Sequence, residues 1–115
     1  MADGPLVVKH LVDGSASILE LSGRLDARSA ASAQDSFAEA VATGAPIVLD
    51  LARLSYLSSV GLRLILKTMK QAQATRRQFV IAGAKGPVKE ILESIGLRQF
   101  CPMVRNRGEA LAKLV

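Results

Sequence analysis

Two apolar segments of this chain are separated by a short polar segment that contains Ser58 and Ser59, and this feature most limits the possible folds. We call the polar segment the hinge. Residues 47–51 (Ile-Val-Leu-Asp-Leu) form a near-continuous apolar run, which is typical of a strand covered on both faces. After the hinge, apolar residues recur at helical spacing, at Val60, Leu62, Leu64, Ile65, Leu66, Met69 and Ala72. The sequence therefore predicts a strand, a short loop and a helix in direct succession.

Two hydroxyls lie at the hinge, where the helix is expected to begin. A helix that starts near Val60 places Ser58 or Ser59 at the N-cap, where a serine oxygen accepts a hydrogen bond from a backbone N–H of the first turn. The same helix end tolerates an anion, because its N–H groups are unpaired and its dipole is positive there. A phosphate would bring a charge of about −1.5 to −2. The residues alone leave both helix capping and switching by phosphorylation open.

The rest of the chain predicts an opening hairpin, followed by alternating helices and strands. Further strands are expected at 5–12, 17–23 and 78–83, with a short edge strand at 100–104. Further helices are expected at 28–41, 87–95 and 110–114. Within the helix at 87–95, the expected buried stripe is Val88, Ile91, Leu92 and Ile95. We therefore expect one α/β domain over residues 1–115, with a mixed sheet of about four to five strands packed by about four helices.

The positive charge of the chain raises the question of nucleic acid. The formal net charge is +5, but the cations are dispersed along the sequence and aromatic residues make up only 3% of it. Nucleic-acid-binding surfaces usually cluster their cations, and those for single strands add aromatic stacking platforms. We therefore expect no nucleic-acid partner, and an acidic protein is the simpler use for the charge.

One cysteine and one histidine limit the available chemistry. Cys101 has no partner for an internal disulfide and is expected to be a small buried hydrophobe. His10 is expected to be a solvated strand residue, and no metal site or cofactor is expected. No apolar run approaches the roughly 18 residues that indicate a membrane span, and no signal peptide is visible. The expectation is a cytoplasmic protein without membrane insertion.

Three segments carry a resemblance to a known family. They are residues 21–26 (Leu-Ser-Gly-Arg-Leu-Asp), 48–62 around the hinge, and 88–97, which end in Ser-Ile-Gly-Leu. In this order they resemble the STAS domain, and specifically the anti-sigma-factor antagonists of bacterial partner-switching systems. The resemblance spans nearly the whole chain and implies the α/β fold of that family.

The resemblance implies a binding switch. In the family, the serine two positions before a glycine is phosphorylated by a partner of the histidine-kinase-like ATPase fold, which is both serine kinase and anti-sigma factor. Counting back from Gly61 places the phosphoacceptor at Ser59, with Ser58 as second choice. The unmodified protein would bind that partner and free its client, and the phosphorylated protein would let go. A serine phosphatase completes the expected set of partners.

The hinge departs from the commonest loop of the family, which reads Asp-Ser-Ser-Gly or Asp-Ser-Thr-Gly. Ser58 stands where the family has the acid, and Val60 replaces the following hydroxyl residue. The loss of the acid leaves Ser58 open as a second acceptor.

Two other functions remain open at this level. Some STAS domains are small subunits of lipid-transporting ABC systems, where they bind the ATPase without a phosphorylation cycle. An enzyme would need a base beside Ser58 or Ser59, yet the only histidine lies in the first expected strand and no Gly-x-Ser-x-Gly elbow exists. We therefore expect no catalytic residues and no enzymatic activity.

Two acidic residues are expected to support the hinge. Asp26 is a favourable N-cap for the helix at 28–41. The matching acid of the family lies beside the phosphorylated loop, so Asp26 is also expected to share the switch surface. Asp50 is expected near the end of its strand, where its carboxylate would orient the loop through backbone donors, because a carboxylate inside a covered strand is costly. Direct contact of Asp50 with a ligand is the alternative.

The helix after the hinge presents a basic stripe and an early glycine. Arg63, Lys67 and Lys70 lie opposite its apolar face, either as an ordinary solvated face or as a docking surface beside the hinge. Gly61 is disfavoured in a helix by roughly 0.5–1 kcal/mol relative to Ala. Either the neighbouring backbone packs closely against it, or a partner must approach the serine there.

Overall fold

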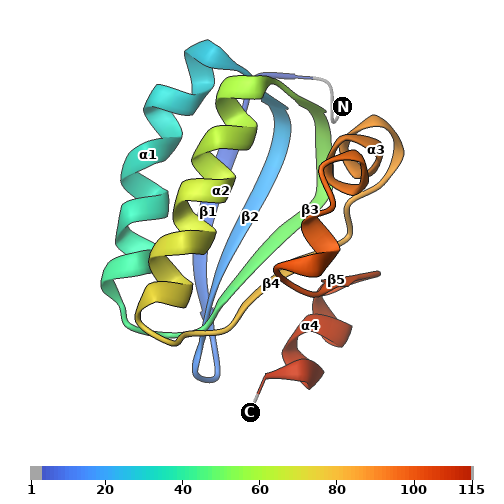
Figure 1. The fold of residues 1–115 in the computed structure, drawn as a ribbon. Coiled ribbons are helices and arrows are strands. Elements are labelled where there is room, and N and C mark those ends of the chain that lie inside the picture. The colour runs from blue at the N-terminus through green and yellow to red at the C-terminus, as the bar shows by residue number, and fades with distance from the viewer. Residues whose placement is uncertain (1–3, 115) are drawn as a thin grey trace.

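The computed structural model describes residues 4–114 (Figure 1). Its sheet has five strands in the spatial order of the sequence: β1 (Val7–Asp13), β2 (Ala16–Leu25), β3 (Ile47–Leu57), β4 (Phe79–Ala82) and β5 (Met103–Val104). β1 and β2 form an antiparallel hairpin, and every other neighbouring pair is parallel. Parallel neighbours require crossover connections, which the helices provide.

Four α-helices pack on this sheet. They are α1 (Ala27–Ala42), α2 (Ser59–Ala74), α3 (Gly86–Ser94) and α4 (Arg107–Lys113), with a 3₁₀ turn, η1 (Leu97–Gln99), after α3. α1 and α2 lie side by side over one face of the sheet (Figure 1). The five strands and four helices confirm the mixed α/β architecture expected from the sequence.

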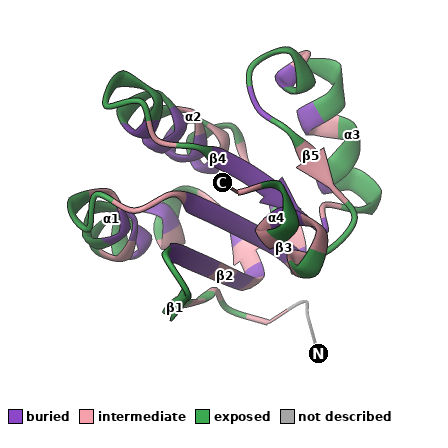
Figure 2. Ribbon diagram, turned by 90° about the horizontal axis from the view of Figure 1, so that it is seen from below, coloured by how far each residue is buried: buried purple, intermediate pink, exposed green. Residues whose placement is uncertain are grey.

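The interior forms two layers of apolar side chains, one on each side of the sheet. The larger lies under α1, α2 and α3, and Phe37 and Phe79 are among its largest members. Cys101 also packs there, and burial raises the pKa of its thiol to about 11, so the expectation of a small buried hydrophobe is confirmed. The smaller layer is where α4 covers Ile18 and Val48 on the opposite face (Figure 2).

β3 is longer than the sequence indicated, because its pattern of buried residues is not a simple alternation. The predicted strand ended at Leu51, but β3 continues to Leu57. Two register shifts against β2 place an extra residue in β3 each time, so that Leu51, Leu54 and Leu57 are buried at intervals of three. β-bulges of this kind break the period of two by which strands are recognised in a sequence.

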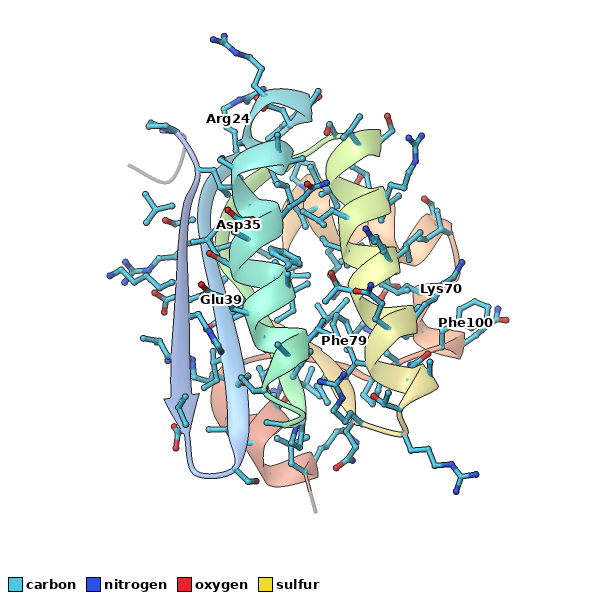
Figure 3. All side chains as sticks on the ribbon, turned by 90° about the vertical axis from the view of Figure 1, so that its left-hand side faces the viewer. Arg24, Asp35, Glu39, Lys70, Phe79 and Phe100 are labelled. Carbon is cyan, nitrogen blue, oxygen red and sulfur yellow. The ribbon has the colours of Figure 1, made fainter. Side chains whose placement is uncertain are left out.

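His10 is not the solvated residue that we expected. Its side chain is only 17% exposed, and Nδ1 lies 4.0 Å from Oε1 of Glu39 on α1. Nε2 is buried and has no hydrogen-bond partner among the described residues. β1 alternates between half-buried and exposed residues, and His10 falls on the side toward α1, where Glu39 is labelled in Figure 3. The position of α1 over the hairpin could not be read from the strand itself.

No helix within residues 4–114 is both long enough and apolar enough to cross a membrane.

Candidate functional site

The β3–α2 loop places its two serines in different surroundings. Ser58 is the N-cap of α2: its Oγ accepts a hydrogen bond from the N–H of Gly61 at 3.1 Å. Its own N–H donates to the carbonyl of Leu25 at 2.9 Å, which ties the loop to the end of β2. Ser58 is half-buried. The capping role predicted for one of the two serines therefore belongs to Ser58.

Ser59 is the first residue of α2 and is exposed. In contrast to Ser58, its hydroxyl makes no hydrogen bond to any residue from 4 to 114. An exposed hydroxyl at the first position of a helix is accessible to a modifying enzyme, and the unpaired N–H groups of that turn lie close to it. Of the two candidate acceptors, Ser59 is the one whose oxygen has no structural task in the described chain.

Asp26 lies at the same edge of the sheet. The parallel pairing of β2 and β3 sets Leu25 opposite Leu57, so Asp26 and Ser58 are the next residues of neighbouring strands, which are spaced about 4.8 Å apart. Asp26 is the N-cap of α1, as predicted, and its Oδ1 accepts from the N–H groups of Arg28 at 3.1 Å and Ser29 at 3.0 Å. The hydrogen bond from the Ser29 backbone is the main cause that lowers the pKa of this carboxyl.

Gly61 is buried against the end of β2. A Cβ atom at this position would lie 2.6 Å from Cγ of Leu25 and 2.9 Å from its carbonyl oxygen. No side chain fits in that space without a shift of the neighbouring strand. The glycine is therefore explained by close packing against both the side chain and the carbonyl group of Leu25. Close packing was one of the two alternatives left open by the sequence.

The basic side chains of α2 run along the helix from the loop. Ser59, Arg63 and Lys67 follow one another at intervals of four residues, which places them on one face of the helix, and all three are exposed. We call these three residues the Ser59 face. Arg63 lies one turn from the Ser59 hydroxyl, so a charge added to that oxygen would be felt by its guanidinium.

An apolar groove lies beside the Ser59 face, and sequence reasoning missed it. It has a volume of about 290 Å³ and is lined by Leu62, Leu66, Met69, Lys70, Ile95, Leu97 and Phe100. Figure 3 shows Lys70 and Phe100 on the same side of the molecule. Ile95, which was expected in the buried stripe of its helix, is exposed here, because α3 ends at Ser94 and the chain turns away after it. Exposed Ile and Phe side chains close to one another are a signal of an interaction surface.

Asp50 is not at the loop, and the prediction that it orients the loop is wrong. It lies within β3, eight residues before Ser58, and is buried. Oδ1 accepts from the N–H of Ala52 at 3.1 Å, and Oδ2 lies 2.9 Å from Nη2 of Arg107 on α4. Arg107 also pairs with Glu20 on β2. The carboxylate is tolerated inside the strand because an arginine 57 residues away in the sequence neutralises it.

Within the described part of the chain, no three or more His, Cys, Asp or Glu side chains lie close enough to hold a metal ion. The site that the structure brings together is a surface of hydroxyl, carboxylate, cationic and apolar groups. Its members are Ser58, Ser59 and Asp26 at the sheet edge, Arg63 and Lys67 along α2, and the neighbouring groove.

A known protein family matches most of this chain. The model of the STAS domain family matches residues 8–110. BtrV of Bordetella bronchiseptica, which is named as an anti-sigma factor antagonist, is 38% identical over 66 residues. That match covers 57% of this chain and 57% of BtrV, which is less than two thirds of the relative.

Solved structures agree in fold. An anti-sigma factor antagonist from Mycobacterium paratuberculosis superposes with a TM-score of 0.86 at 23% identity, covering 95% of this chain and 93% of the other. The Bacillus cell fate determinant SpoIIAA in its phosphorylated form gives a TM-score of 0.72 at 21% identity, covering 94% of this chain and 97% of the other. At these identities the likeness concerns the fold.

Proposed function

The chain belongs to the STAS domain family, and from that premise we propose that it is an anti-sigma factor antagonist controlled by phosphorylation of Ser59. In this proposal the unmodified protein is a single domain that binds an anti-sigma factor through the Ser59 face and the apolar groove. The anti-sigma factor is a serine kinase of the histidine-kinase-like ATPase fold. Phosphorylation of Ser59 releases it, and a serine phosphatase resets the cycle in the cytoplasm.

The proposal rests on a difference in hydrogen bonding and exposure between the hydroxyls of Ser58 and Ser59. Ser58 uses its oxygen to cap α2, whereas Ser59 is exposed and makes no hydrogen bond within residues 4–114. A kinase needs an accessible hydroxyl, and the removal of a capping oxygen would weaken the helix on which the binding surface lies. The geometry thus favours Ser59 over Ser58 as the acceptor.

The surface around Ser59 also suits a charge switch. Arg63 and Lys67 attract an acidic partner, and the groove offers apolar area for it to bury. A phosphate brings a charge of about −1.5 to −2 into the same contact. It offsets the nearby cations and must lose water when a partner covers it, and a change of about 1.4 kcal/mol already alters affinity tenfold. We therefore expect phosphorylation to lower the affinity for the partner and to release it.

The relatives support the class of function. BtrV is named as an anti-sigma factor antagonist. SpoIIAA, which shares the fold, has been solved in an unphosphorylated and in a phosphorylated form. The assignment of the same cycle to this chain rests on the Ser59 hydroxyl and its neighbours.

A co-purification from the native host tests the proposal. Tagged protein would be isolated as the native form and as Ser59→Ala, Ser59→Glu and Ser58→Ala variants, and the bound proteins identified by mass spectrometry. We expect a kinase of the histidine-kinase-like ATPase fold on the native, Ser59→Ala and Ser58→Ala forms, and a loss of at least about tenfold on Ser59→Glu, as a charge at the contact implies. Capture of a membrane-transporter ATPase, equally by Ser59→Ala and Ser59→Glu, would instead support a constitutive transporter subunit.

A further inference from the structure

β1 is an edge strand with an unusual set of exposed side chains. The strand order leaves β1 with one neighbour, β2, so one side of its backbone has no strand partner in the described chain (Figure 2). Val7, Leu11 and Val12 are 49%, 37% and 74% exposed. Natural sheets usually protect such an edge with charges, prolines, bulges or a covering segment, because an open apolar edge pairs readily with another strand.

The charges on β1 are arranged symmetrically about Leu11. Lys9 and Asp13 lie two residues to either side of it and therefore on the same face of the strand. At about 3.3 Å per residue they are roughly 13 Å apart, which is too far for an ion pair within the strand. Neither forms a salt bridge to any residue from 4 to 114. The strand thus carries two opposite charges without a described ionic partner.

We propose that β1 pairs antiparallel with β1 of a second copy of the chain, about a two-fold axis at Leu11. In this register the two Leu11 side chains face each other, and Lys9 of each copy faces Asp13 of the other. Cross-strand partners in an antiparallel pair have Cβ atoms about 4.5–5.5 Å apart, within reach of an ion pair. In such a pair, each Lys9 lies opposite Asp13 of the other copy, so two ion pairs form. The pairing also covers the exposed side chains of Leu11 and Val12.

The charge pattern favours a second copy over an unrelated strand. A two-fold axis requires that the surface be complementary to itself, and the spacing of Lys9, Leu11 and Asp13 meets that condition. Pairing would join two five-stranded sheets into one continuous sheet. An interface made by one strand from each copy is small compared with a standard protein interface of about 1,600 Å². We therefore expect a weak dimer whose population depends on concentration.

The proposed contact lies away from the Ser59 face. β1 runs antiparallel to β2, so its Leu11 end lies where β2 begins, whereas the loop with Ser59 lies where β2 and β3 end (Figure 1). A dimer through Leu11 leaves both copies of the switch surface open. Pairing through β1 does not depend on the function proposed for Ser59.

Sedimentation equilibrium over a series of concentrations, with charge-reversal variants, tests the pairing. The single changes Lys9→Asp and Asp13→Lys each create two like-charge pairs across the axis, and we expect each to weaken self-association at least about tenfold. The double reversal, Lys9→Asp with Asp13→Lys, restores the opposite pairs and is expected to return the association to within about threefold of the native value. Lys89→Asp on α3 is the control for net charge and should leave the association unchanged.

Disulfide trapping tests the register independently. Leu11→Cys places two thiols across the axis, and we expect a covalent dimer under mild oxidation. Val7→Cys is the matched control: it lies on the same face and is more exposed, but in this register the two positions are roughly 26 Å apart and should not cross-link. The native Cys101 is buried and has a raised thiol pKa of about 11, so it should not interfere.

Three results would overturn the proposal. They are a protein that stays monomeric at every concentration, a double reversal that associates no better than the single changes, and a Val7→Cys variant that cross-links as fast as Leu11→Cys. A monomer whose β1 binds a strand of another protein would give the first result.

Discussion

Asp50 lies within β3 and Ser59 lies just beyond its end, and the two side chains differ in how their polar groups are satisfied. Within the strand, the carboxylate of Asp50 is buried and bonded to Ala52 and Arg107. Just beyond the strand, the hydroxyl of Ser59 is exposed and has no bond within the described residues. Most buried polar groups have hydrogen-bond partners within the fold, whereas an exposed polar group is open to an external partner. Asp50 therefore holds the fold together, and Ser59 is available for chemistry.

Removal of the cation that pairs with the buried Asp50 should have the greatest effect on stability. Arg107→Met leaves the carboxylates of Asp50 and Glu20 close together without a cation, and we expect the free energy of unfolding to fall by about 2–3 kcal/mol. Urea denaturation at pH 7 measures it. The control is Arg105→Met, because Arg105 forms an exposed pair with Glu109 that should contribute less than about 0.5 kcal/mol. Equal losses in the two variants would remove the distinction between the two pairs.

A smaller effect is expected where the loop packs on β2. Gly61→Ala pushes a Cβ to within 2.6 Å of Cγ of Leu25, and we expect a loss of about 1–3 kcal/mol of stability. In a Leu25→Ala background the clash with that side chain is gone, so the same change should cost less. Additive losses in the double variant, measured by denaturation, would argue against this contact as the reason for the glycine.

The Ser58→Ala and Ser59→Ala variants should differ in their free energy of unfolding. Ser58→Ala removes the cap of α2 and is expected to cost about 1 kcal/mol. Ser59→Ala removes a hydroxyl with no described bond and should change stability by less than about 0.5 kcal/mol. Thermal or urea unfolding of the pair decides the point. A larger loss in Ser59→Ala than in Ser58→Ala would reverse the roles given to them here.

The smallest effect is a pH dependence at the neighbouring cap. The pKa of Asp26 is lowered below 3.8, chiefly by the Ser29 backbone bond, so the ionised carboxylate stabilises the fold above that value. This contribution is lost as the pH falls through the lowered pKa. Asp26→Asn keeps a capping oxygen but cannot titrate. We expect the stability difference between the native protein and this variant to shrink below about pH 4, and a difference that stays constant from pH 7 to pH 2 would contradict the role of the charge.

The parts of the fold that follow from local pattern were predictable. The strand, loop and helix around residues 47–66, the hairpin and the cap at Asp26 all rest on residues close together in the sequence. The errors arose where distant parts meet. Asp50 is neutralised by Arg107, far away in the chain, and bulges hide the second half of β3. A single segment carries no signal for either.

The sequence predicted the serines of the site, but it did not predict their hydrogen bonding or the apolar groove beside them. The register from Gly61 pointed to Ser59, but the difference between a bonded and a free hydroxyl requires the geometry of the helix start. The apolar groove is formed between α2 and the segment after α3, where Ile95 and Phe100 are exposed. Their hydrophobic character alone suggested burial or an edge strand.

The role of Ser59 as the switch is tested most directly by mapping phosphate on the protein purified from its native host under several growth and stress conditions. Peptide mass spectrometry on the native form and on the Ser58→Ala and Ser59→Ala variants would assign the site. We expect phosphate on Ser59 that persists in Ser58→Ala and disappears only in Ser59→Ala. Phosphate on Ser58 alone, or none under any condition, would contradict the claim that the free hydroxyl of Ser59 is the switch.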